Sequence, residues 1–206
     1  MTLINEIVPG IFTWSEFSDE KQLNFNGYYI ARNGESVLID PPAFDDSGME
    51  ELQALLAKHS DCPLKAILLT NVHHDRTSRE LKEKFLVPVH IHEKDARLLE
   101  FPPDKTFVDG EVGFCGLQVI HLNDQKSPGE SAFLLPDSAV LIVGDALIGK
   151  VPGKVDLLPP EKYKNIQLAK EGLRVLLDRD FETLLVGDGD CILKNAKKVV
   201  EDFLQG

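Results

Sequence analysis

A polar cluster whose side chains could do chemistry follows a short apolar run in the first half of the chain. Residues 66–69 have the length and composition of a buried strand, and a helical pattern begins near Ser78. Thr77 and Glu80 have the spacing of a capping box at the start of that helix. The cluster is therefore predicted in a loop between a strand and a helix, where functional residues often lie. Its sequence is Thr70-Asn71-Val72-His73-His74-Asp75-Arg76.

Imidazole and carboxylate side chains in such a loop can bind a metal ion or take part in acid–base chemistry. Two histidines alone are more often ordinary loop residues than ligands. The interpretation as a functional site therefore depends on the loop position between a strand and a helix and on the neighbouring Asp75. Asp75 is the one candidate for a catalytic residue. His74 is expected to face away from the site.

Composition excludes several classes of partner. The 206 residues include 22 Lys and Arg against 34 Asp and Glu, a net charge of −12, which argues against nucleic acid and against an anionic membrane as partners. The three cysteines are scattered and show no Cys-x-x-Cys spacing, as in a reduced compartment. No segment is apolar enough to span a membrane, and residues 1–6 do not resemble a signal peptide. A single domain over residues 1–206 and a cytoplasmic location are expected.

The order of elements is strands, helices, strands, helices. In the first part, strands are predicted over 6–17, 25–31, 36–40, 65–70 and 87–91, with helices over 49–59, 78–85 and 93–100. In the second part, strands are predicted over 111–122, 131–135, 139–143 and 183–186, with a long helix after residues 159–160 and a last helix over 192–204. Two sheets packed face to face with helices outside would bury these apolar stripes.

The polar cluster resembles the signature loop of the metallo-β-lactamase superfamily. In that family a strand ends in Thr-His-x-His-x-Asp-His, and the loop supplies ligands to two metal ions. His73 and Asp75 match this pattern, whereas Asn71 and Arg76 stand at histidine positions. The resemblance implies an α+β fold, a four-layer αββα sandwich with two mixed sheets, of the short glyoxalase II-like type.

The same resemblance extends over roughly residues 6–190 and identifies further positions. Asp40 ends a strand that is similar to one ending in a buried aspartate. Lys126 stands at the third metal-binding histidine before Ser-Pro-Gly, and Asp145 matches the carboxylate that bridges the two metals. Asp188 stands at the last histidine position. These loops are expected to surround one cleft.

The departures from the family pattern predict a poor zinc site. Of the seven ligand positions only His73, Asp75 and Asp145 are kept, and catalytic zinc needs at least three protein ligands. Asp75, Asp145 and Asp188 form an oxygen set better suited to Mg²⁺ or Mn²⁺, beside Arg76. No cofactor is therefore expected. The alternative is one divalent ion (Zn, Mn or Fe), for which the candidate ligands are His73, Asp75, Asp145 and Asp188.

Three functions remain open. The first is a non-hydrolytic domain that has lost its dinuclear site and serves binding, regulation or scaffolding. The second is a metal-dependent hydrolase of a thioester, ester or lactone with an altered mononuclear site. The third is recognition of a small anionic ligand, helped by backbone N–H groups at the start of the Ser78 helix. The candidate ligand-binding residues are Asn71, His73, His74, Arg76, Lys126 and Asp188. The sequence leaves the ligand, the pathway and the oligomeric state open.

Without metal ions, three carboxylates would meet at one partly buried site. Each pair of like charges at about 4 Å costs on the order of 4 kcal/mol at an effective dielectric near 20. Because Arg76 and Lys126 are positively charged departures, they are predicted to neutralise these carboxylates. We expect Arg76 in bidentate contact with Asp188 or Asp145, and Lys126 donating to Asp145 or Asp75.

Overall fold

Two mixed β-sheets form the centre of the computed structural model, which describes residues 4–206. The first sheet has seven strands in the order of the chain, and the second has four in the order β11-β10-β9-β8. The first sheet comprises β1 (Asn5–Val8), β2 (Ile11–Ser18), β3 (Leu23–Arg32), β4 (Glu35–Ile39), β5 (Leu64–Leu68), β6 (Val89–His92) and β7 (Lys105–Phe107). The second comprises β8 (Gln118–His121), β9 (Ser131–Leu135), β10 (Val140–Val143) and β11 (Thr183–Val186).

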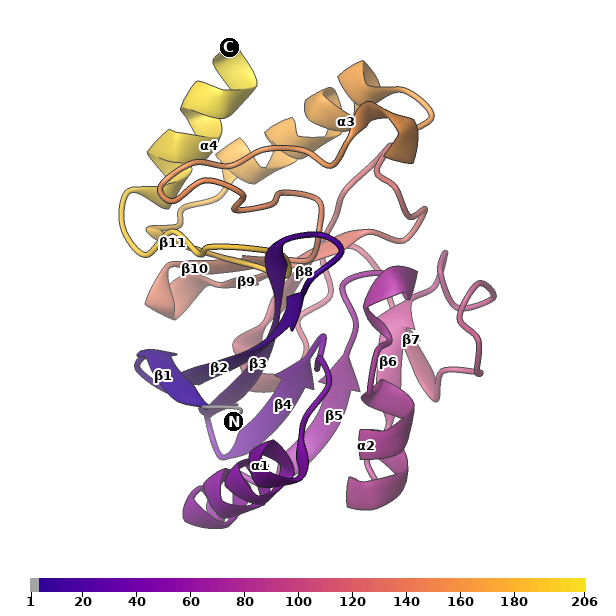
Figure 1. Cartoon of the computed structure of the whole chain (residues 1–206), viewed down its shortest axis with the longest axis vertical. Coiled ribbons are helices and arrows are strands. Elements are labelled where there is room, and N and C mark those ends of the chain that lie inside the picture. The colour runs from indigo at the N-terminus through magenta and orange to yellow at the C-terminus, as the bar shows by residue number, and fades with distance from the viewer. Residues whose placement is uncertain (1–3) are drawn as a thin grey trace.

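Four α-helices cover the outer faces of the sheets, which gives the predicted αββα order of layers (Figure 1). Helices α1 (Asp46–Lys58) and α2 (Ser78–Phe85) pack on the first sheet, and α3 (Ile166–Gly172) and α4 (Ala196–Gln205) pack on the second. Short 3-10 turns lie at Val72–His74, Phe114–Gly116, Pro136–Ser138, Pro160–Lys162 and Leu173–Asp178. The α+β sandwich expected from the sequence is confirmed.

The alternation of side chains along each strand separates three apolar cores. In β5, Ile67 faces the helices on the outside whereas Leu68 faces the second sheet. In β10, Ile142 belongs to the core between the sheets and Leu141 to the core under α3 and α4. Strands β9, β10 and β11 are buried along their whole length, and they hold the loops at their ends in fixed positions.

The predicted bounds of several helices and strands agree with the structure, and the predicted bounds of others are wrong. The predictions for α2, β9 and β11 agree with the structure to the residue. The strand predicted over 6–17 is two strands, because the chain turns at Gly10, whose φ of +76° favours glycine. The strand predicted over 111–122 is only β8, and the long helix after 159–160 is α3 followed by a 3-10 turn.

The helix predicted over 93–100 is absent, and the segment forms turns. Its buried Asp95 side chain accepts hydrogen bonds from Val72 N (3.1 Å), from Gly129 N (2.7 Å) and from the Ser127 hydroxyl. Because this carboxylate fastens two loops of the site edge, long-range bonds determine the local backbone. The apolar periodicity of residues 93–100 does not indicate that Asp95 binds these distant partners.

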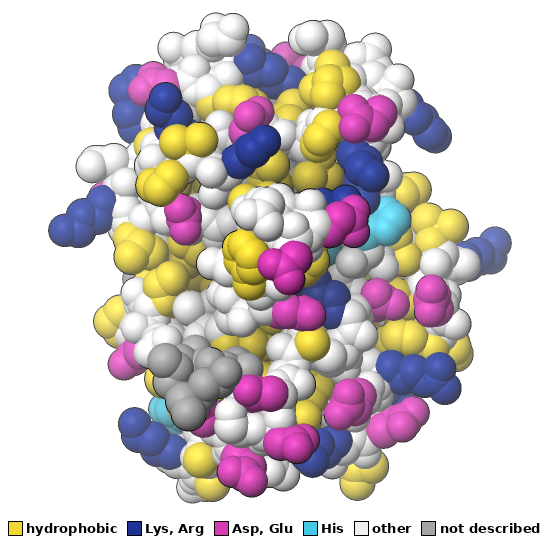
Figure 2. Space-filling model, in the orientation of Figure 1, with side chains coloured by type: hydrophobic (Ala, Val, Ile, Leu, Met, Phe, Trp, Pro, Cys, Tyr) yellow, Lys and Arg dark blue, Asp and Glu magenta, His cyan; other side chains and the backbone are white. Residues whose placement is uncertain are grey.

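Figure 2 shows acidic and basic side chains interspersed over one face of the molecule, with hydrophobic side chains in separate groups. Within residues 4–206, no helix is long and apolar enough to cross a membrane. The predicted single domain and the segment predicted not to be a signal peptide both include residues 1–3. These three residues lie outside the described residues.

Candidate functional site

Four loops that are far apart in the sequence meet at one edge of the sandwich, as predicted. Asn71 follows β5, Lys126 follows β8, Asp145 follows β10 and Asp188 follows β11. Asn71 Nδ2 lies 2.9 Å from Asp145 Oδ1, and Lys126 Nζ lies 2.6 Å from Asp145 Oδ2. The Arg76 guanidinium lies 3.1 Å from Asp188 Oδ1.

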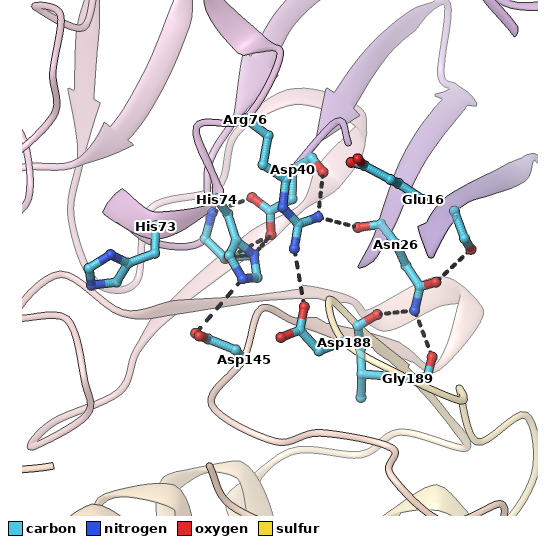
Figure 3. A network of polar contacts seen from close by, with 12 residues as sticks. Glu16, Asn26, Asp40, His73, His74, Arg76, Asp145, Asp188 and Gly189 are labelled. Carbon is cyan, nitrogen blue, oxygen red and sulfur yellow. Dashed lines mark hydrogen bonds and ion pairs between the residues drawn. The ribbon is translucent and has the colours of Figure 1, made fainter. Parts of the chain in front are cut away.

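Arg76 joins the polar loop to the far end of β11 (Figure 3). Its Nη2 donates to Asp188, and its Nη1 donates to the carbonyl oxygens of Asn26 (3.1 Å) and Asp40 (3.3 Å). The guanidinium also lies over the Phe25 ring, 4.9 Å from its centroid. The predicted pairing with Asp188 is therefore present, but the predicted bidentate contact with one carboxylate is wrong.

Lys126 and Asn71 together bind the Asp145 carboxylate. Lys126 donates to Oδ2, and Asn71 Nδ2 donates to Oδ1 and also to Glu130 Oε1 at 3.0 Å. Asp145 is 3% exposed, so this pairing replaces most of its contact with water. Arg76 and Lys126 are thus paired with Asp188 and Asp145, two positions that the resemblance places around metal ions.

His74 does not face away from the site, so that prediction is wrong. The ring is buried, with Nδ1 2.8 Å from Asp40 Oδ2 and Nε2 3.9 Å from Asp145 Oδ1 (Figure 3). A Cβ at Gly187 would lie 2.6 Å from His74 Cε1, so only glycine leaves room for the ring there. The ring orientation therefore depends on residues distant in the sequence.

Asp40 is the buried residue that fixes this orientation. Its Oδ1 accepts from Thr70 N at 2.8 Å, and its Oδ2 accepts from Thr70 Oγ1 at 2.5 Å and faces His74. The backbone of Asp40 is left-handed, with φ of +47°, which turns the chain sharply after β4. The strand-end aspartate singled out in the sequence thus supports the polar loop.

The two other residues kept from the family pattern do not join this group. His73 is exposed and points away from the cluster in Figure 3, although it lines a cavity of about 570 Å³ that lies over the cluster. Loss of solvation on the side of the imidazole that faces the protein, together with the positive charge of Lys126, lowers the pKa of His73. Asp75 accepts from Arg76 N at 2.8 Å and does not line the cavity.

The start of α2 also differs from the sequence prediction. Thr77 precedes the helix but makes no capping hydrogen bond, because its hydroxyl donates to the carbonyl oxygens of Pro41 and Pro42. The backbone N–H of Ser78 donates to Asp75 O at 2.7 Å. The capping box is therefore wrong, and this N–H group is not free for an anion.

Within the described part of the chain, one group of side chains could hold a single metal ion. His74, Asp145 and Asp188 each offer one ligand atom, and these atoms lie within 4.8 Å of one another. A dinuclear zinc centre does not fit, because amide, guanidinium and ammonium groups stand at the missing imidazole positions. A single ion would have to compete with Arg76 and Lys126 for both carboxylates.

Burial and charge act on the three acidic groups in different directions. Burial raises the pKa of Asp188 despite the nearby Arg76. Burial would also raise the pKa of Asp145, but interactions with His74 and Lys126 hold it below its ordinary value. Burial and the Asp145 charge raise the pKa of Glu130 well above its ordinary value. The site therefore places Glu130, whose pKa is raised, beside Asp145, whose pKa is lowered.

Glu130 was not identified from the sequence. The residue is fully buried, and its Oε2 has no hydrogen-bond partner among residues 4–206. One sign was available, since an acidic residue directly precedes the apolar strand β9. A buried carboxyl group without a cation of its own favours the neutral form.

We expect Glu130→Gln to remove a pH dependence of stability. The folded protein keeps the Glu130 proton that the unfolded chain releases above its ordinary pKa. The free energy of unfolding should thus fall as the pH rises from the ordinary glutamate pKa toward the raised pKa of Glu130 in the folded protein, by up to about 1.4 kcal/mol per pH unit. Urea denaturation between pH 5 and 8 should show the variant gaining on the wild type as pH rises. A constant difference would contradict the assignment.

A cavity of about 570 Å³ lies over this group, where the cleft was expected. His73, His74 and the two ion pairs line its floor. Apolar side chains form part of its wall, and additional lysines stand around it. The wall residues are Leu23, Phe25, Ile148, Leu158 and Pro159, and the lysines are Lys21, Lys150 and Lys162.

Comparisons with known proteins agree with this architecture. A family described as the metallo-beta-lactamase superfamily matches residues 5–205. The chain is similar to a metallo-beta-lactamase from Pontibacter korlensis, with 18% identity and a TM-score of 0.78, over 100% of this chain and 98% of the other. It is also similar to the DIM-1 metallo-beta-lactamase, with 17% identity and a TM-score of 0.74, over 98% of each chain.

A third similar structure is a metallo-beta-lactamase family protein from Thermus thermophilus. Its identity is 22% and its TM-score 0.69, over 97% of this chain and 80% of the other. No curated protein matches the sequence significantly. At these identities the structural likeness establishes the fold alone.

Proposed function

The chain belongs to the metallo-β-lactamase superfamily, and from this premise we propose that it is a non-hydrolytic member that binds a small anionic ligand. The cavity over Arg76 and Lys126 would be the binding site, with a degenerate metal site as its floor. One observation carries the proposal. Asp145 and Asp188, which belong to the group that could hold a metal ion, are already paired with Lys126 and Arg76.

The charges around the cavity support an anionic ligand. Five basic and three acidic side chains line it, although the whole chain has a net charge of −12. Asp145 and Asp188 are paired with Lys126 and Arg76, and Lys21 is paired with Glu20, which does not line the cavity. Lys150 and Lys162 therefore outnumber the one remaining acidic lining residue, Glu16. Such a local excess attracts anions against the overall field. The apolar wall favours a ligand with a hydrophobic body.

We expect benzoate to raise the melting temperature more than benzamide, its neutral counterpart of the same shape. The benzoate charge should interact with the lysines, and the ring should pack against the wall near Phe25 and Leu158. Thermal unfolding and chemical-shift titration at low salt would measure this difference. Lys150→Gln should weaken benzoate binding, whereas Lys65→Gln, at the start of β5 and outside this cavity, should not. Equal effects of benzoate and benzamide would reject the proposal.

The group of His74, Asp145 and Asp188 supports a second candidate function, a hydrolase with one divalent ion. A bound ion would supply a water of lowered pKa for attack on an ester, thioester or lactone. Both ion pairs would then have to open.

We expect negligible hydrolysis of β-lactams, lactones and thioesters, unchanged when Zn²⁺ or Mn²⁺ is added. The reason is that Arg76 and Lys126 hold the two carboxylates that the ion would need. Initial rates with and without each metal would test this. Hydrolysis that rises with metal concentration and disappears in Asp145→Asn would favour the second candidate.

A further inference from the structure

A second cavity adjoins the first on the far side of Lys126. Its volume is about 460 Å³, and it shares Lys126 and Lys162 with the first cavity. The loop before β9 and the residues around the start of α3 form its sides. The two cavities therefore adjoin, with Lys126 and Lys162 between them, and they are named the first and the second lobe.

The second lobe is also basic. Lys94 and Lys164 line it in addition to the shared pair, and Asp124 is its one acidic lining residue among residues 4–206. Lys94 Nζ lies 3.5 Å from His121 Nε2. No carboxylate of the described chain lies within 4.0 Å of Lys94, Lys162 or Lys164. These ammonium groups are therefore available to a negatively charged group of a ligand.

Unpaired lysines are common on protein surfaces, but here they gather around two adjoining cavities of an acidic chain. In an acidic chain, like charges that gather around two adjoining hollows repel one another without a counter-charge. An anion in the first lobe would face Lys150, Lys162 and Lys126. Lys94 and Lys164 in the second lobe would still have no negatively charged partner from the ligand. A single small anion therefore does not satisfy both lobes.

We propose that the ligand is an extended dianion, with one negative group in the first lobe and another in the second. This inference rests on the proposed function and specifies its ligand class. The connecting part would pass Lys126 and lie against apolar side chains on both sides, Leu158 in the first lobe and Leu168 in the second.

A series of unbranched carboxylates tests this inference. Glutarate, adipate, suberate and sebacate are each compared with the monocarboxylate of equal chain length, by chemical-shift titration at low salt. At least one dicarboxylate should bind about five- to tenfold more tightly than its monocarboxylate, because it gains a second charge interaction. This preference should shrink in about 300 mM salt, since the lysines are exposed.

Variants show where the second charge binds. Lys94→Gln combined with Lys164→Gln should abolish the preference for the dicarboxylate and leave monocarboxylate binding in the first lobe unchanged. Lys58→Gln combined with Lys65→Gln provides the matched loss of two charges outside both lobes. A preference that persists in the double variant would overturn the inference.

The outcomes separate the two proposals. Monocarboxylates and dicarboxylates that bind equally well would overturn the dianion and leave the proposed function standing. No binding of any carboxylate, with correctly folded protein, would overturn both.

Discussion

Replacing Arg76 with alanine is expected to lower the free energy of unfolding by about 3 kcal/mol. The side chains of Arg76 and Asp188 are only 13% and 11% exposed, so the lost guanidinium would leave a poorly solvated carboxylate. The carbonyl oxygens of Asn26 and Asp40 would also lose a donor. Urea denaturation at pH 7 measures the change.

A matched pair of substitutions distinguishes the stability lost through an unpaired buried charge from the stability lost through missing side-chain contacts. Arg76→Met together with Asp188→Leu should cost much less than the two single changes added together, because no charge is left unpaired. Arg79→Ala is the control, since its pair with Glu83 is 70% exposed on both sides and should contribute little. Additive losses at Arg76 and Asp188 would show that the two side chains do not neutralise each other.

Removing both protein cations is expected to create a metal site. In Arg76→Met combined with Lys126→Met, the ligand atoms of His74, Asp145 and Asp188 would remain within reach of one ion. A divalent cation would then restore the lost neutralisation, so Zn²⁺ or Mn²⁺ should bind at least about 100-fold more tightly than to the wild type.

Calorimetric titration and the rise in melting temperature with added Mn²⁺ would both report this gain. The melting temperature remains informative even in a destabilised variant, because binding stabilises the folded state. Adding Asp145→Asn should abolish the gain. Unchanged metal affinity in the folded double variant would mean that the two cations do not stand in for a metal ion.

Some strand ends could be predicted from the sequence pattern, whereas most residues of the site were identified through the resemblance to the family. β9 and β11 are short apolar runs bounded by polar residues, so their limits and the loops after them were readable. The resemblance to the family placed Lys126, Asp145 and Asp188 in loops of one site, and their opposite charges then predicted the pairing of Lys126 with Asp145 and of Arg76 with Asp188. The strand limits depended on local pattern, whereas the pairing depended on the resemblance and on the sign of charge.

Side-chain directions within the polar loop could not be predicted in this way. His74 turns inward because Asp40, 34 positions earlier, binds its ring, and because Gly187 leaves space for it. Glu130 and Asp95 are buried carboxyl groups whose partners lie in other loops. Such contacts form only when the two sheets are packed, and no spacing within one segment encodes them.

Arg76 and Lys126 hold the two carboxylates that a metal ion would need in this fold. Metal analysis by mass spectrometry of protein purified without added metal or chelator tests this most directly. The account predicts zinc, iron and manganese far below one ion per chain, with Arg76 and Lys126 paired to Asp188 and Asp145. About one equivalent of any of these metals, lost in Asp145→Asn, would contradict it.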